Sequence, residues 1–150
     1  MALLHSRRAR LLSFVLDSSV ALSWCFKDEQ TPETVGVLSM AKTRAIFVPP
    51  IWHVEMSNIL GMALRKGRLN KAEVLGAIGL FAALELHTDS TVRPTGPGTL
   101  VPLMQLHRLT AYDAAYLELA LRLNLPLATL DKQLAAAASN AGVALILPSS

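Results

Sequence analysis

The chain has 150 residues, of which 52% are hydrophobic and 17% charged, and its formal net charge is +3. This length suits one domain with a full core, and the composition is far from that of a disordered chain. The single cysteine excludes an internal disulfide, and the mild positive charge permits a polyanionic partner without requiring one. These properties predict one globular domain in a reducing compartment, the cytoplasm.

The chain begins with a basic leader. Three arginines precede a short apolar run, as they would in a signal peptide. Asp17 ends that run early, and the bulky Trp24 stands where a cleavage site would need a small residue. No stretch reaches the roughly 18 uncharged apolar residues of a spanning helix. We therefore expect a soluble protein, with a loose leader over residues 1–12 and the domain over residues 13–150.

Short apolar runs then alternate with helical patterns. Capping and breaking residues separate them: Thr31 begins one helix, Gly67 ends another, and Asn124 ends a third. Pro102 is expected to shorten the helix that contains it. The expected order is strand 14–16, helices 18–26 and 32–42, strand 45–48, helices 51–66 and 70–84, strand 85–88, a short helix ending at 107, helix 111–123, strand 127–130, helix 131–140 and strand 143–147.

This alternation predicts an α/β fold with a parallel sheet covered by helices on both faces. The five expected strands are short and apolar on both faces, as burial between two helix layers requires. In an open sheet of this kind, ligands bind at the carboxyl edge of the strands. The polar residues that follow the strands are therefore the first candidates for function.

Four carboxylates occupy such positions or lie among apolar neighbours. Asp17 and Asp131 follow strands, Glu55 comes about one helical turn after the second strand, and Asp113 lies in the first turn of a helix. Helix capping would explain each aspartate alone, and Asp113 three residues after Thr110 resembles a capping box. Capping does not explain Glu55, which lies inside an apolar helix. Most other acids fall in turns or helix starts that we expect to be solvated: Asp28, Glu29, Glu33, Glu73 and Asp89.

Four carboxylates in one cleft would repel each other. A pair about 4–5 Å apart costs roughly 3–4 kcal/mol at an effective dielectric constant near 20. A divalent cation removes this conflict, and ligation by oxygen alone suits Mg²⁺ or Mn²⁺. Such an ion activates water and stabilises charge on a phosphoryl group, so the implied reaction is hydrolysis of a phosphodiester. The four histidines lack metal-ligand spacing, which argues against a zinc site.

The acids lie in the segments VLDSS at 15–19, EMSN at 55–58, LTAYDAAY at 109–116 and ATLD at 128–131. Together these segments resemble the four acidic motifs of PIN-domain ribonucleases, and most closely those of the VapC-type toxins of bacterial type II toxin–antitoxin systems. The resemblance implies a three-layer α/β/α sandwich around a central, mostly parallel sheet. It also implies an endoribonuclease dependent on Mg²⁺ or Mn²⁺, in which Asp17, Glu55, Asp113 and Asp131 are the catalytic metal ligands.

The same resemblance implies three partners. RNA is the implied substrate. Family members are usually homodimers, and they are usually neutralised by a cognate antitoxin. The carboxy-terminal segment of that antitoxin covers the acidic pocket and often places a basic side chain in it.

Polar residues beside the acids are candidates for supporting roles. Ser18, Asn58 and Thr129 are candidates to orient the acids or to hold metal-bound water. A purely structural explanation is about equally good for each of them: helix capping for Ser18, solvation for Asn58 and a strand-end position for Thr129.

Basic residues are candidates for contacts with RNA phosphates. Arg65, Lys66 and Arg68 form a cluster that a solvated turn between two helices explains slightly better. Lys132 directly follows the fourth acidic segment.

Three other functions remain open. A housekeeping PIN nuclease in RNA processing would share the fold and the acids, but the absence of an added nucleic-acid-binding domain favours the toxin. An aspartyl-phosphate phosphatase or a response receiver also begins with an acid after a strand, but serines rather than a second aspartate follow Asp17, which counts against the phosphatase. A non-catalytic interaction module would use the acids only as helix caps, and its biological effect would survive Asp17→Asn.

Overall fold

The computed structural model describes residues 13–90 and 96–147; the predicted leader, part of the turn-rich segment before residue 96 and the last three residues lie outside this part. The elements follow one another as β1 (Phe14–Leu16), α2 (Ser18–Ser23), the 3₁₀ turn η1 (Lys27–Glu29), α3 (Pro32–Ala41), β2 (Ile46–Val48), α4 (Ile51–Arg65), α5 (Lys71–Ala83), β3 (Leu86–Thr88), α6 (Gly96–His107), α7 (Ala111–Leu123), β4 (Leu127–Ala128) and α8 (Lys132–Asn140).

The strands form one parallel sheet in the order β3-β2-β1-β4. Strand β1 is central: Val15 pairs with Phe47 of β2 on one side and with Leu127 of β4 on the other. All three residues of β1 are fully buried, which explains why its sequence is apolar without alternation. Because the strands are parallel, their carboxyl ends meet at one edge of the sheet.

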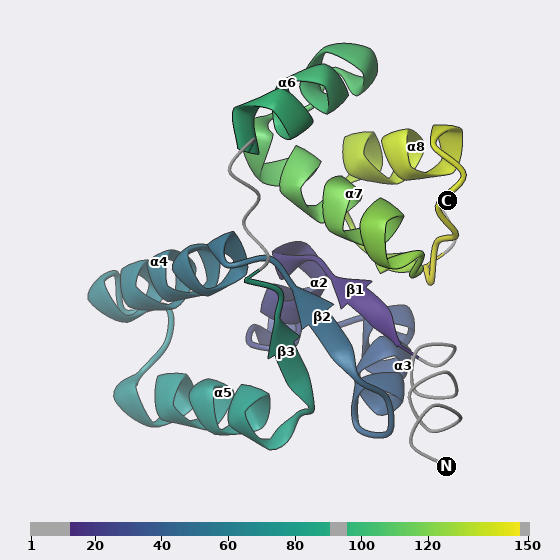
Figure 1. The fold of residues 1–150 in the computed structure, drawn as a ribbon. Helices are drawn as coiled ribbons and strands as arrows, with labels where there is room; N and C mark the ends of the chain where they lie inside the picture. The colour runs from purple at the N-terminus through teal and green to yellow at the C-terminus, as the bar shows by residue number, and fades with distance from the viewer. Residues whose placement is uncertain (1–12, 91–95, 148–150) are drawn as a thin grey trace.

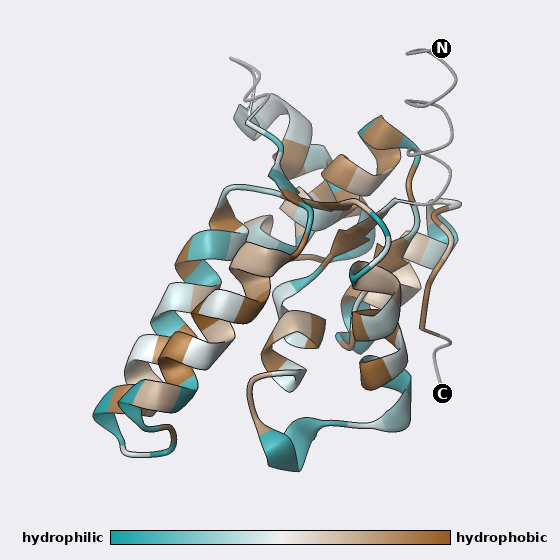
Figure 2. Ribbon diagram, turned by 90° about the horizontal axis from the view of Figure 1, so that it is seen from below, coloured by the Kyte–Doolittle hydropathy of each residue, from teal (hydrophilic) through white to brown (hydrophobic). Residues whose placement is uncertain are grey.

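Helices cover both faces of this sheet (Figure 1). Helix α7 packs against β1 and β4, with α6 and α8 beside it. Helices α2 and α3 lie behind the strands, and the pair α4–α5 projects past the β3 edge (Figures 1 and 2). The predicted three-layer α/β/α fold with a parallel sheet is confirmed.

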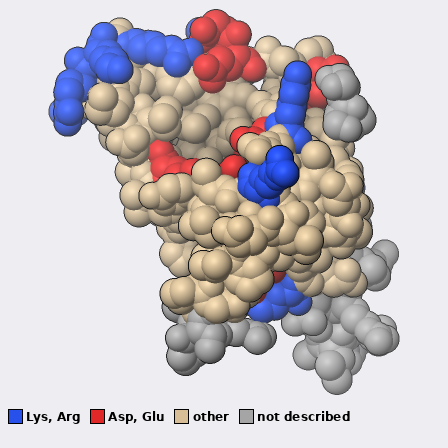
Figure 3. Space-filling model, turned by 90° about the horizontal axis from the view of Figure 1, so that it is seen from above, with Lys and Arg blue, Asp and Glu red and all other residues tan. Residues whose placement is uncertain are grey.

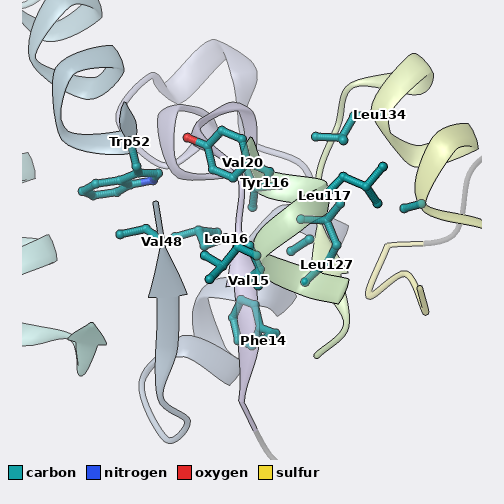
Figure 4. Packing of buried hydrophobic residues seen from close by; sticks show 14 of the residues in the cluster. Phe14, Val15, Leu16, Val20, Val48, Trp52, Tyr116, Leu117, Leu127 and Leu134 are labelled. Carbon is teal, nitrogen blue, oxygen red and sulfur yellow. The ribbon is translucent and has the colours of Figure 1, made fainter. Parts of the chain in front are cut away.

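Hydrophobic packing holds the layers together. The strands are largely hydrophobic, whereas the helices are banded with hydrophobic and hydrophilic residues (Figure 2). Leu117 and Tyr116 of α7 pack against the strands, with Leu134 of α8 beyond them (Figure 4). Each large side chain buried in this way contributes about 1.5–3 kcal/mol to the free energy of unfolding.

The α4–α5 pair has a smaller core of its own, to which Phe26, Leu60 and Leu69 contribute. Gly67 follows the end of α4, and its φ of +73° is a left-handed conformation that glycine adopts without strain. Asn70 then caps α5 by accepting from the Glu73 amide at 2.8 Å. The break between the two helices therefore follows from local chemistry.

Two sequence predictions are wrong. The last strand, 143–147, is reduced to one isolated bridge between Leu127 and Leu145, because the neighbouring β4 is only two residues long. Pro102 does not shorten its helix, since α6 runs through it for 12 residues. Proline removes one helical hydrogen bond, and the packing of Leu103 and Met104 against the core offsets this loss.

Candidate active site

Asp17 lies at the carboxyl end of the central strand. Its side chain is 4% exposed, and it does not cap α2, although it occupies the N-cap position. Its Oδ2 accepts hydrogen bonds from the Ser19 hydroxyl at 2.5 Å and from the Thr129 hydroxyl at 2.7 Å. Burial raises the pKa of Asp17, and these two hydrogen bonds partly oppose the rise.

Ser19 and Thr129 also tie β1 to the segment after β4. Ser19 Oγ accepts from the Leu130 amide at 2.9 Å, and Thr129 Oγ1 accepts from the Asp131 amide at 3.0 Å. The predicted role of Thr129 in orienting an acid therefore has a geometric basis. Sequence reasoning missed Ser19; its position two residues after Asp17, where a hydroxyl can bond back to the acid, was the available signal.

Glu55 reaches the same edge from α4. Its Oε1 accepts a 2.6 Å hydrogen bond from the hydroxyl of Tyr116, a fully buried residue of α7. Burial raises the pKa of Glu55, while hydrogen bonds from Tyr116 and Ser18 lower it. Ser18 thus acts on both acids, through its side chain on Glu55 and through its backbone amide on Asp17. Sequence reasoning missed Tyr116, whose spacing of three residues from Asp113 places both on one side of a helix.

Asp113 and Asp131 complete the group from α7 and α8. Asp113 is not the cap of α7: Thr110 is, and its hydroxyl accepts from the Asp113 amide at 3.2 Å. Asp131 does cap α8, since its Oδ1 accepts from the Leu134 amide at 2.8 Å. Partial burial raises the pKa of Asp113 to about 6, and the charges of Asp131, Asp17 and Glu55 add to the rise.

All four carboxylates line one cleft of about 320 Å³. In the surface view, acidic side chains lie in a hollow with basic side chains at its margin (Figure 3). Asn58 also lines the cleft and is exposed there. The remaining lining residues are Ser18, Ser19, Leu22 and Ile59.

The chemistry of this cleft fits a hard divalent cation, because its polar atoms are carboxylate, amide and hydroxyl oxygens. Among residues 13–90 and 96–147, no group of three His, Cys, Asp or Glu side chains lies close enough together to bind a metal ion as it stands. Mg²⁺ does not need one, since it keeps several waters and is held by one or two carboxylates.

A second cleft, lined by residues of α6, of α7 and of the segment after β3, contains acids in a different situation. Arg122 donates to Asp89 Oδ2 at 3.0 Å and to Glu118 Oε1 at 2.7 Å. The negative charges of both acids are therefore compensated by the Arg122 guanidinium. The prediction that Asp89 lies in a solvated turn is wrong, because its side chain is 10% exposed in this ion-pair network.

The basic residues proposed to contact RNA fall into two situations. Arg68 is already engaged: it pairs with Asp28 and Glu29 at 3.2 and 3.1 Å, and its guanidinium lies 4.0 Å above the Phe26 ring centre. Arg65 and Lys66 are exposed at the end of α4. Lys132 is exposed at the start of α8, next to Asp131.

Comparison with known proteins agrees with this geometry. A family profile described as the PIN domain matches residues 14–140, which contain every strand and all four acids. The chain belongs to the PIN domain family. The fold is similar to the crystal structure of PAE2754 from Pyrobaculum aerophilum, with 21% identity, a TM-score of 0.61, and coverage of 83% of this chain and 78% of that one. A search of curated proteins finds no match.

PIN domains are usually metal-dependent nucleases, so membership places the chain among the nucleases of the PIN superfamily. Within the part of the chain that the structure describes, no helix has the length and apolar character needed to cross a membrane.

Proposed function

We propose that this PIN domain is a metal-dependent endoribonuclease toxin of the VapC type, which cleaves RNA and is inhibited by a cognate antitoxin. The observation that carries the catalytic part is the cleft in which Asp17, Glu55, Asp113 and Asp131 meet from four separate parts of the chain. The interaction-module alternative would use these acids as helix caps. Of the four, Asp131 caps a helix, whereas Asp17 and Asp113 do not and Glu55 lies inside one.

These four carboxylates are the proposed metal site, in which one or two would bind Mg²⁺ directly and the others through its waters. A bound Mg²⁺ or Mn²⁺ would supply charge stabilisation at the phosphodiester and a more acidic water. The chain's own contribution is orientation: Ser19 and Thr129 hold Oδ2 of Asp17 and so fix the direction of its carboxylate. Without a cation, the negative cleft would repel the phosphodiester, so the same residues make cleavage depend on metal.

Basic residues are proposed to hold the RNA backbone. Lys132 is adjacent to the acidic cleft in sequence and exposed, so it is suited to a phosphate next to the cleaved bond. Arg65 and Lys66 lie ten or more residues beyond Glu55 along α4, about 15 Å away at 1.5 Å per residue. They suit a more distant phosphate.

A protein partner would account for apolar residues exposed on the α4–α5 pair. Val54, Leu75 and Ile78 are 63%, 59% and 54% exposed, and Ile78 lines an apolar groove with Met56 and Phe81. Apolar grooves of this kind accept amphipathic segments. The antitoxin and a second copy of the chain are the partners that we propose.

The test is cleavage of total cellular RNA by the purified chain, freed of any antitoxin, in Mg²⁺, in Mn²⁺ and in chelator. Discrete fragments that require metal and disappear with Asp17→Asn would support the nuclease. Equal results from the wild type and the variant in every metal would support the interaction module instead.

A second experiment separates a toxin from a housekeeping nuclease. Induced expression of the wild-type chain alone is expected to arrest growth, expression of Asp17→Asn is not, and co-expression with the product of an adjacent small gene is expected to restore growth. Normal growth with an active nuclease would favour the housekeeping function.

A further inference from the structure

The hydrogen bond from Tyr116 to Glu55 joins two helices across the carboxyl edge of the sheet. The donor–acceptor distance is 2.6 Å, and the two residues are 61 positions apart in the sequence. The Tyr116 side chain is 0% exposed, and its ring packs over the sheet with the hydroxyl directed toward the side where Trp52 of α4 lies (Figure 4). Glu55, three residues after Trp52, also belongs to α4.

This contact gives the two oxygens of the Glu55 carboxylate different roles. Oε1 is held by a phenol that water does not reach, because the ring is buried in the core. A buried phenol without an acceptor would be unfavourable, so the bond resists exchange. Glu55 lines the cleft, and Oε2 is the oxygen that the Tyr116 bond leaves for a ligand there.

We propose that Tyr116 is a positioning residue that restricts Glu55 to ligation through one oxygen and thereby makes the cleft select Mg²⁺ over Ca²⁺. Mg²⁺ requires near-octahedral ligands at about 2.0–2.1 Å, which a single carboxylate oxygen satisfies. Ca²⁺ accepts both oxygens of a carboxylate and longer, irregular distances. A glutamate whose second oxygen is held by a buried phenol is therefore matched to the smaller ion. The inference rests on the proposed metal-dependent function.

The test is the ratio of Mg²⁺ to Ca²⁺ affinity in Tyr116→Phe, measured by titration calorimetry on the full chain without RNA. The substitution keeps the ring and removes only the hydroxyl. Mg²⁺ affinity is expected to fall by about 10-fold or more, as for other groups that orient metal ligands, while Ca²⁺ affinity stays equal or rises. Tyr112→Phe is the matched control, since Tyr112 lies on the same helix and is 59% exposed. It should leave both affinities unchanged.

Equal losses for both ions, or no loss for either, would overturn the assignment. If Tyr116→Phe does not fold, infrared difference spectra of the wild type answer the same question. Isotope-labelled glutamate should show a one-oxygen carboxylate signature on addition of Mg²⁺, and a two-oxygen signature would contradict the proposal. If the wild-type chain binds no divalent cation, the proposed function itself is refuted. If the wild-type chain binds metal and Tyr116→Phe leaves the ratio of Mg²⁺ to Ca²⁺ affinity unchanged, only the role of Tyr116 is refuted.

Discussion

The Thr129 hydroxyl donates to Oδ2 of Asp17 at 2.7 Å, although the two residues are 112 positions apart in the chain. The contact spans the carboxyl ends of the neighbouring strands β1 and β4, so the sheet itself brings it about. The most buried acid of the cleft is thus oriented by the strand beside it.

Thr129→Val should weaken metal binding while preserving the shape of the side chain. The variant removes the donor to Asp17 and the acceptor for the Asp131 amide, and loss of such an orienting group typically costs 10- to 100-fold in metal affinity. Calorimetric titration with Mg²⁺ measures the change. Thr43→Val is the control, because Thr43 is exposed and bonds only locally to Met40. Unchanged metal affinity in Thr129→Val would contradict an orienting role.

Asp113 should make the metal-free protein less stable as pH rises. Its pKa in the folded chain is about 6, against an ordinary value of 3.8, so the folded state binds this proton more tightly than the unfolded chain does. The resulting stability is complete below pH 3.8 and is lost as pH passes through about 6. Melting temperatures in chelator should therefore coincide for wild type and Asp113→Asn near pH 4, with the variant higher at pH 7.5. A constant difference at all pH values would refute this account.

The three residues of the basic cluster are expected to differ in role. Arg68 should stabilise the fold, whereas Arg65 and Lys66 should bind RNA. Arg68→Ala is expected to lower the melting temperature, because it removes contacts to Asp28, Glu29 and the Phe26 ring. Arg65→Ala should leave the melting temperature unchanged and weaken RNA binding, with a shallower dependence of affinity on salt concentration. Fluorescence melting and binding titrations at several salt concentrations measure both effects. Equal RNA binding by Arg65→Ala and wild type would exclude Arg65 from the RNA-binding surface.

The two tryptophans allow a matched test of one hydrogen bond. Trp24 Nε1 donates to the Thr34 carbonyl at 2.8 Å, whereas Trp52 Nε1 is buried without a hydrogen-bond partner in the described part of the chain. Both rings contact Phe81. Substitution by phenylalanine removes similar volume at each site, so Trp24→Phe should cost about 1 kcal/mol more in the free energy of unfolding than Trp52→Phe. Urea denaturation measures the difference, and equal costs would show that the Trp24 hydrogen bond contributes nothing net.

The order of the elements was predictable because local signals mark their ends. Thr31 and Asn70 cap helices, and Gly67 and Asn124 end them through left-handed conformations, as the sequence indicated. Tertiary packing determined the features that these local signals do not predict. Contacts of α6 with the core keep Pro102 inside a helix, and the short β4 gives the last predicted strand little edge on which to pair.

The acids of the site were predictable from the sequence, whereas the side-chain contacts that hold them in place were not. Asp17 and Asp131 were identifiable because both follow predicted strands, and a parallel sheet places the carboxyl ends of its strands at one edge. Tyr116 was not, because its bond to Glu55 depends on how α4 and α7 approach each other, which no local pattern encodes. Asp89 was misread for the same reason, since its partner Arg122 lies 33 positions away.

The central position of β1 has a consequence for biosynthesis. Asp17 is made early, but the strand on one side of it, which leads to Asp131, is added more than a hundred residues later. A nascent or truncated chain that lacks β4 carries at most three of the four acids and lacks the Thr129 hydroxyl that orients Asp17. The proposed ribonuclease activity would therefore appear only when synthesis of the domain is almost finished, so an incomplete chain would not cleave the messenger RNA from which it is translated.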